Sequence, residues 1–84
     1  METGDIVISL AGHDRGKPFV IVAQVSEKFA LIADGQTRSL ENPKLKRTKH
    51  LRAVEKSGLE NPSNASLKKR LKKFISERRV YAEK

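Results

Sequence analysis

Apolar residues gather in three short runs within the first 33 residues of the chain. Residues 6–11 (IVISLA) place alternate side chains on opposite sides, which predicts a strand with one buried face. Residues 19–25 are apolar almost throughout, as expected for a central strand of a small β-structure. Residues 29–33 form a third apolar run after a short polar turn. Together the three runs predict an antiparallel β-meander.

Turn-forming residues divide the segment that follows. Asp34-Gly35 is a strong hairpin signal, and it predicts a fourth strand over residues 36–40 with an exposed edge. Asn42-Pro43 ends that strand, and residues 49–54 can supply a fifth. The expected fold class is therefore mainly β, with five short antiparallel strands within residues 1–56.

A basic amphipathic helix is predicted near the C-terminus, after a linker at residues 57–64. Ser, Gly, Asn and Pro make up most of that linker, and these residues favour turns. The helix is expected over residues 65–79 with Asn64 as its N-cap, so that residues 65–84 form a basic helix and tail. Its apolar side chains share one stripe at helical spacing: Leu67, Leu71, Phe74 and Ile75.

The charge of the chain is unevenly divided between its two halves. The formal net charge is +8. Residues 1–40 contain four Lys and Arg against five acidic residues, whereas residues 41–84 contain 14 against five. A near-neutral module therefore precedes a cationic extension. Such clustering points to a polyanionic partner, above all nucleic acid; the alternative is a solvated surface that charge keeps soluble.

Composition argues against several other classes of protein. The chain has no cysteine, and its two histidines show no metal-binding spacing, so neither a metal nor a cofactor is expected. The Gly-Lys pair at residues 16–17 does not belong to a P-loop, because Pro follows it, and we expect no enzymatic activity. No apolar run approaches the roughly 20 residues of a membrane span. With no visible signal peptide, we expect a cytoplasmic protein that is monomeric when free and has no membrane contact.

The most informative motif lies between the first two predicted strands. Residues 11–22 read AGHDRGKPFVIV, a charged loop with a glycine at each side. This pattern resembles the KOW motif of ribosomal proteins and transcription elongation factors. Segments at residues 4–7, 29–35, 40–44 and 50–51 also resemble the sequences of a family of KOW-containing large-subunit ribosomal proteins and their small bacterial relatives.

The resemblance implies both a fold and a function. It implies that the five strands form a small SH3-like barrel and that the chain binds RNA. It also implies that the RNA is ribosomal, with ribosomal proteins as further candidate partners. The chain departs from the commoner KOW pattern at Phe19-Val20, where a further Gly-Lys is frequent, so RNA contacts are not carried over there.

Three groups of residues are candidate RNA contacts, and they suit phosphates better than bases. In the loop, glycines would let an RNA backbone approach, cations would bind phosphates, and Asp14 would order the loop. A basic run after the fourth strand and the basic helix are the other two groups. The full set is Gly12, His13, Arg15, Gly16, Lys17 and Arg38, then Lys44, Lys46, Arg47, Lys49 and Arg52, then Lys68, Lys69, Arg70, Lys72 and Lys73.

Each group also has a simpler or a competing interpretation. The glycines can serve turn geometry alone, and the basic segments can be solvated surfaces. The apolar stripe of the helix could instead make the chain a protein-interaction module that docks a transcription or translation factor. A membrane-surface helix is less well supported, because the stripe is short and lacks Trp. Phe19, Phe29 and Phe74 are expected in the core, which leaves Tyr81 as the ring free to stack on bases.

The charges of the predicted helix disfavour it in isolation. Lys68 with Lys72, and Lys69 with Lys73, are like-charge pairs one turn apart. Cations near its start also oppose the helix dipole. We therefore expect the helix to be partly frayed in the free protein and to gain order when phosphates neutralise it.

Overall fold

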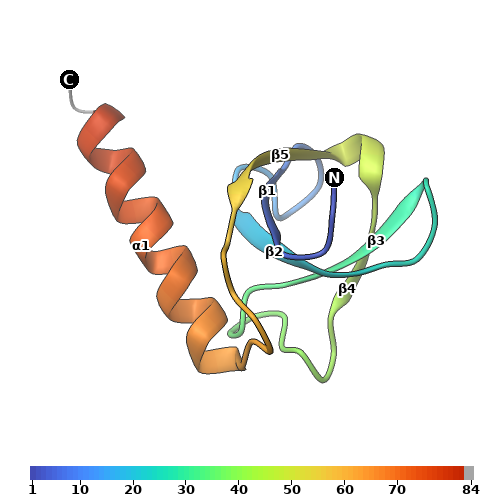
Figure 1. The fold of residues 1–84 in the computed structure, drawn as a ribbon. Helices are drawn as coiled ribbons and strands as arrows, with labels where there is room; N and C mark the ends of the chain where they lie inside the picture. Colours follow the sequence, from blue (N-terminus) through green and yellow to red (C-terminus); the bar gives the residue numbers. More distant parts are fainter. Residues whose placement is uncertain (83–84) are drawn as a thin grey trace.

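The computed structural model describes the backbone of residues 1–82 and the side chains of residues 1–77. The end of the predicted tail, residues 83–84, and the side chain of Tyr81 lie outside these parts. The chain is mainly β, as predicted, with one C-terminal helix (Figure 1). Its elements are β1 (Asp5–Ser9), β2 (Pro18–Gln24), β3 (Phe29–Ala33), β4 (Lys44–Arg47), the 3-10 turn η1 (Thr48–His50), β5 (Leu51–Lys56) and α1 (Asn64–Ala82).

The five strands form a single antiparallel sheet in the order β4-β3-β2-β1-β5. The sheet is strongly curled, and α1 lies outside the ring that the strands trace (Figure 1). β4 and β5 are its two edges, and η1 joins them. In the part of the chain that the structure describes, these two strands do not pair with each other, so hydrogen bonds do not close the sheet.

Both faces of the three central strands, β1, β2 and β3, are largely buried, and each face has its own apolar cluster. Ile6 and Val7 are adjacent in β1 and both are fully buried, so the prediction of a single buried face for this strand was wrong. The second face is covered because α1 packs on it. The cluster under the helix is Ile6, Val20, Ala33, Leu67, Leu71 and Phe74. The cluster on the other face is Val7, Phe19, Ile21, Ala30, Ile32 and Leu51.

The predicted fourth strand was wrong, because residues 36–40 do not pair with the sheet. The carboxylate of Asp34 accepts hydrogen bonds from the backbone N–H of Gln36 (2.9 Å) and of Arg38 (2.8 Å) and from the hydroxyl of Thr37 (2.6 Å). A side chain that binds the local backbone in this way competes with strand pairing. The fourth strand is instead β4, formed by the first residues of the predicted basic run. The fifth strand begins at Leu51 because residues 48–50 take the η1 turn.

The helix is capped by Ser63 and not, as predicted, by Asn64. The Ser63 hydroxyl accepts a hydrogen bond from the backbone N–H of Ser66 (3.0 Å), and the Ser66 hydroxyl accepts one from the N–H of Ser63 (2.8 Å). This is a reciprocal cap of the kind that satisfies free N–H groups at a helix start. Asn64 has a different role: its Oδ1 accepts the N–H of Leu40 at 2.8 Å, and its Nδ2 donates to Glu41 at 2.8 Å.

The predicted apolar stripe is confirmed at three of its four positions. Leu67, Leu71 and Phe74 are at most 4% exposed and belong to the cluster under the helix. Ile75 is 43% exposed. The segment before the helix is also part of the folded structure, since Ser57 is buried and Leu59 packs against the same cluster. Part of the predicted linker, residues 57–64, therefore packs against the rest of the fold.

Gly35 lies where the β3–β4 connection meets the start of α1. Its φ is +78°, and a Cβ atom there would overlap the backbone carbonyl oxygen of Asn64. The two segments can approach this closely only because Gly35 has no side chain. The contact sets how near the start of the helix comes to the sheet.

We predict that Gly35→Ala lowers the free energy of unfolding by about 2–3 kcal/mol, because it adds a backbone overlap to the strain of a positive φ. Urea denaturation followed by circular dichroism measures this. Gly58→Ala is the matched control: Gly58 has φ +75° but open space around its Cβ position, so it should cost only about 1 kcal/mol. Equal losses in the two variants would show that the Gly35–Asn64 contact does not limit the helix position.

Candidate nucleic-acid interface

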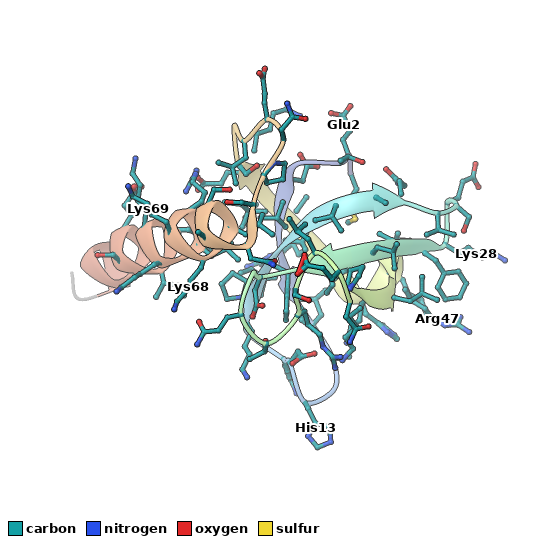
Figure 2. The ribbon with its side chains drawn as sticks, turned by 90° about the horizontal axis from the view of Figure 1, so that it is seen from below. Glu2, His13, Lys28, Arg47, Lys68 and Lys69 are labelled. Carbon is teal, nitrogen blue, oxygen red and sulfur yellow. The ribbon has the colours of Figure 1, made fainter. Side chains whose placement is uncertain are left out.

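The loop between β1 and β2, residues 10–17, is closed at its base and ordered by its own backbone. Ser9 N–H donates to the carbonyl of Lys17 (3.1 Å), and Gly16 N–H donates to that of Ser9 (2.8 Å). Within the loop, Arg15 N–H donates to the carbonyl of Gly12 at 3.2 Å. His13 stands at the tip and points away from the sheet (Figure 2). The loop therefore presents His13 and Arg15 to solvent on a fixed backbone.

An ion pair fastens this loop to the edge strand β4. Lys44 Nζ lies 2.6 Å from Asp14 Oδ2, and the two side chains are 26% and 15% exposed. The hydrogen bond from Lys44 lowers the pKa of Asp14, and the charges of Lys44, Arg38 and Lys17 lower it further against the opposing effect of burial. Asp14 thus orders the loop through Lys44, and four charged side chains gather at this point.

A second lysine of β4 fastens the same loop. Lys46 Nζ donates a 2.9 Å hydrogen bond to the carbonyl oxygen of Ala11. Lys44 and Lys46 alternate along β4 with Leu45 and Arg47, so they share the face that meets the loop. The structure therefore places two predicted RNA contacts, Lys44 and Lys46, in contacts that hold the loop in position.

A groove brings the loop and the helix together. It has a volume of about 450 Å³. Three of its side chains are lysines from distant parts of the sequence, Lys17 of the loop and Lys68 and Lys72 of α1. Figure 2 shows Lys68 on the side of α1 nearer to the His13 loop and Lys69 on the other side. The remaining lining residues are Pro18, Asp34, Gln36, Leu71 and Ile75.

Among the described side chains of the helix, Lys69, Arg70 and Lys73 do not line this groove. Arg70 Nε donates to the carbonyl of Ser57 at 3.0 Å, and its Nη2 lies 2.7 Å from a carboxylate oxygen of Glu55. Lys73 Nζ lies 4.0 Å from Glu77 one turn later. Arg70 therefore fastens α1 to the end of β5. No local pattern distinguishes it from its basic neighbours.

Besides the groove, a separate basic hollow of about 250 Å³ is formed by Lys28, Arg47, Thr48 and Lys49. Lys28 and Arg47 lie on the side of the sheet opposite to α1 (Figure 2). The Arg47 guanidinium carbon lies 5.4 Å from the centre of the Phe29 ring, close enough for a cation–π contact. The sequence pattern predicted Phe29 in the core, but its side chain is partly exposed at this hollow.

The basic hollow and the groove contain residues that sequence reasoning missed. Lys28 reaches the hollow because the N–H of Thr48 donates to its carbonyl at 2.8 Å, a contact between two turns. Gln36 and Ile75 reach the groove through the Asp34 turn and the packing of α1. No local signal in the sequence marks Lys28, Gln36 or Ile75 as part of these sites.

Arg52, another of the predicted RNA contacts, is exposed on β5, opposite Ile8 of β1.

The Asp14–Lys44 pair predicts a pH dependence. Because the pKa of Asp14 is below its ordinary 3.8 in the folded chain, its stabilising effect is complete above that value and is lost as the pH falls through the folded-state pKa. We expect Asp14→Asn to reduce stability by about 1 kcal/mol near neutral pH, and the difference from the native chain to vanish in strong acid.

Urea unfolding of both proteins across this pH range gives the measurement. Asp34, whose pKa is also lowered because its hydrogen bonds outweigh burial, is present in both proteins, so its titration cancels in the difference. A difference that stays constant down to low pH would contradict the ion-pair role of Asp14.

The basic surface is the main functional feature of the described residues. They hold no group of three or more His, Cys, Asp or Glu side chains that could bind a metal ion. Within the same part of the chain, the helix is not long and apolar enough to cross a membrane. No protein-family model matches the chain, and no curated protein matches it.

Proposed function

We propose that this chain is a non-enzymatic RNA-binding protein that associates with ribosomal RNA or the ribosome through phosphate contacts. The observation that carries the proposal is the groove where Lys17, Lys68 and Lys72 converge. Among the described side chains, none of these three lysines forms an ion pair. A concave site with several unneutralised cations concentrates positive potential and attracts a polyanion.

The ribosomal part of the proposal comes from the sequence resemblance to the KOW family. In support of it, the glycine-flanked loop joins two antiparallel strands, β1 and β2, as a β-loop-β motif requires. We regard the curled sheet as an SH3-like barrel in which η1 connects β4 and β5 in place of strand pairing. A cytoplasmic location accords with this role.

The cations divide into those that hold the fold and those available to phosphates. Lys44, Lys46 and Arg70 hold the fold through the contacts described above. Besides Lys46, the cations without an ion pair among the described residues are Arg15, Lys17, Lys28, Arg38, Arg47, Lys49, Arg52, Lys68, Lys69 and Lys72. Phosphate contacts from such side chains give affinity and orientation without reading sequence.

The competing interpretation is a protein-interaction module, and the surface on which it depends is mostly buried within the chain. It requires the apolar stripe of the helix to dock a transcription or translation factor. Leu67, Leu71 and Phe74 instead pack against the sheet of the same chain. Only Ile75 remains substantially exposed on that stripe, and one side chain is a small docking surface compared with known interfaces.

The electrostatic part is tested by the salt dependence of binding to a labelled RNA hairpin. If about six to eight phosphates are neutralised, the log–log slope should be roughly −4 to −7. Lys68→Gln with Lys72→Gln should make the slope shallower by about 1.4–1.8. Lys69→Gln with Lys73→Gln is the matched control, with the same charge change on the other side of the same helix, and it should have a smaller effect. A native slope near zero would contradict phosphate binding, and equal effects would contradict the groove.

The ribosomal assignment needs a separate experiment. Crosslinking the protein to RNA in cells and sequencing the attached RNA should recover ribosomal RNA above its background level. Recovery of mainly other RNA classes, with the salt slope retained, would leave RNA binding intact and overturn the ribosomal assignment.

A further inference from the structure

We propose that the groove between α1 and the β1–β2 loop holds an unpaired nucleotide of the bound RNA, with its base on an apolar floor and its phosphates on the lysines. This inference rests on the proposed RNA-binding function and names the part of the RNA that the groove takes. Phosphate clamping alone needs only cations. The groove has, in addition, features that suit a base.

The first feature is the apolar floor. Pro18, Leu71 and Ile75 line the groove between its lysines. Ile75 is 43% exposed, although its neighbours on the stripe, Leu71 and Phe74, are each only 4% exposed. A planar base placed on Ile75 would remove apolar surface from water, which favours binding.

The second feature is the arrangement of charge and polar groups around that floor. Lys17, Lys68 and Lys72 supply three ammonium groups, and Asp34 is the one carboxylate among the lining residues. The oxygens of Asp34 accept hydrogen bonds from the 36–38 turn, and among the described residues no ion pair joins Asp34 to a lysine. The exposed Gln36 side chain offers two N–H donors and one carbonyl acceptor, as the edge of a base requires.

The size of the groove and the geometry of RNA point to an unpaired nucleotide. Its volume of about 450 Å³ lies within the roughly 300–1,000 Å³ of pockets that hold small molecules. In an RNA duplex the faces of the bases are stacked and cannot reach such a floor. Bases in single strands, loops and bulges can be splayed out and bound. The carboxylates of an acidic peptide could use the lysines, but they do not match the apolar floor.

Three labelled probes of similar length separate these possibilities: a single-stranded RNA octamer, an abasic octamer with the same phosphates, and an octamer of poly-glutamate. We expect the RNA to bind about three- to tenfold more tightly than the abasic strand, with the same salt slope. Poly-glutamate should bind no better than the abasic strand. Equal affinity for RNA and the abasic strand, or preference for poly-glutamate, would overturn the nucleotide assignment.

One serine variant in the groove and one control outside it test where the base makes contact. Ile75→Ser should remove most of the preference for RNA over the abasic strand without changing the salt slope. Leu45→Ser is the control, since Leu45 is 54% exposed and lies on β4 outside the groove. Gln36→Ala gives a second, independent variant in an exposed turn, and it should reduce the same preference. Unchanged preference in both Ile75→Ser and Gln36→Ala would overturn the assignment.

Failure of this inference can be told from failure of the proposed function. If the chain binds both strands with a steep salt slope but shows no preference for bases, phosphate binding stands and the nucleotide site is wrong. If it binds neither strand, or binds both with a slope near zero, RNA binding itself is wrong. Circular dichroism and thermal unfolding of each variant confirm that it is folded.

Discussion

The packing of α1 on the sheet is the interaction on which the rest of this structure depends. An 84-residue chain is close to the size at which a single core becomes marginal. Here Leu67, Leu71 and Phe74 cover Ile6 and Val20, so the same strands are buried on both faces. Without the helix, one of the two apolar clusters would face water. The C-terminal segment is therefore an integral layer of the domain and more than a basic extension.

The same packing decides which lysines form the groove. Leu71 is buried against the sheet, and Lys68 and Lys72 lie three positions before and one after it, so they flank the buried stripe on the loop side. Lys69 projects from the other side of α1 (Figure 2). The contact between Gly35 and Asn64 holds the start of the helix close to the β3–β4 connection. The position of the candidate site is thus a consequence of core packing.

Much of the secondary structure follows from local pattern, whereas the errors have both local and non-local causes. The apolar runs at residues 19–25 and 29–33 predicted β2 and β3, and helical spacing predicted α1. The strand predicted at residues 36–40 failed because the Asp34 carboxylate binds the backbone that follows it. At the site, charge identified the basic segments. It could not distinguish Lys44, which pairs with Asp14 across the fold, from Lys68, because both are lysines in basic runs.

The charge of the helix bears on the proposed binding of RNA. Like charges at Lys68 and Lys72 oppose helix formation, as does the absence of acidic residues in the first turn of α1. The Ser63 cap and the burial of Leu67 and Leu71 act in the opposite direction. Packing rather than propensity therefore holds the first turns of the helix. A polyanion that neutralises the two lysines would remove a term that opposes the fold, so the proposed RNA binding would stabilise the same contact that creates the groove.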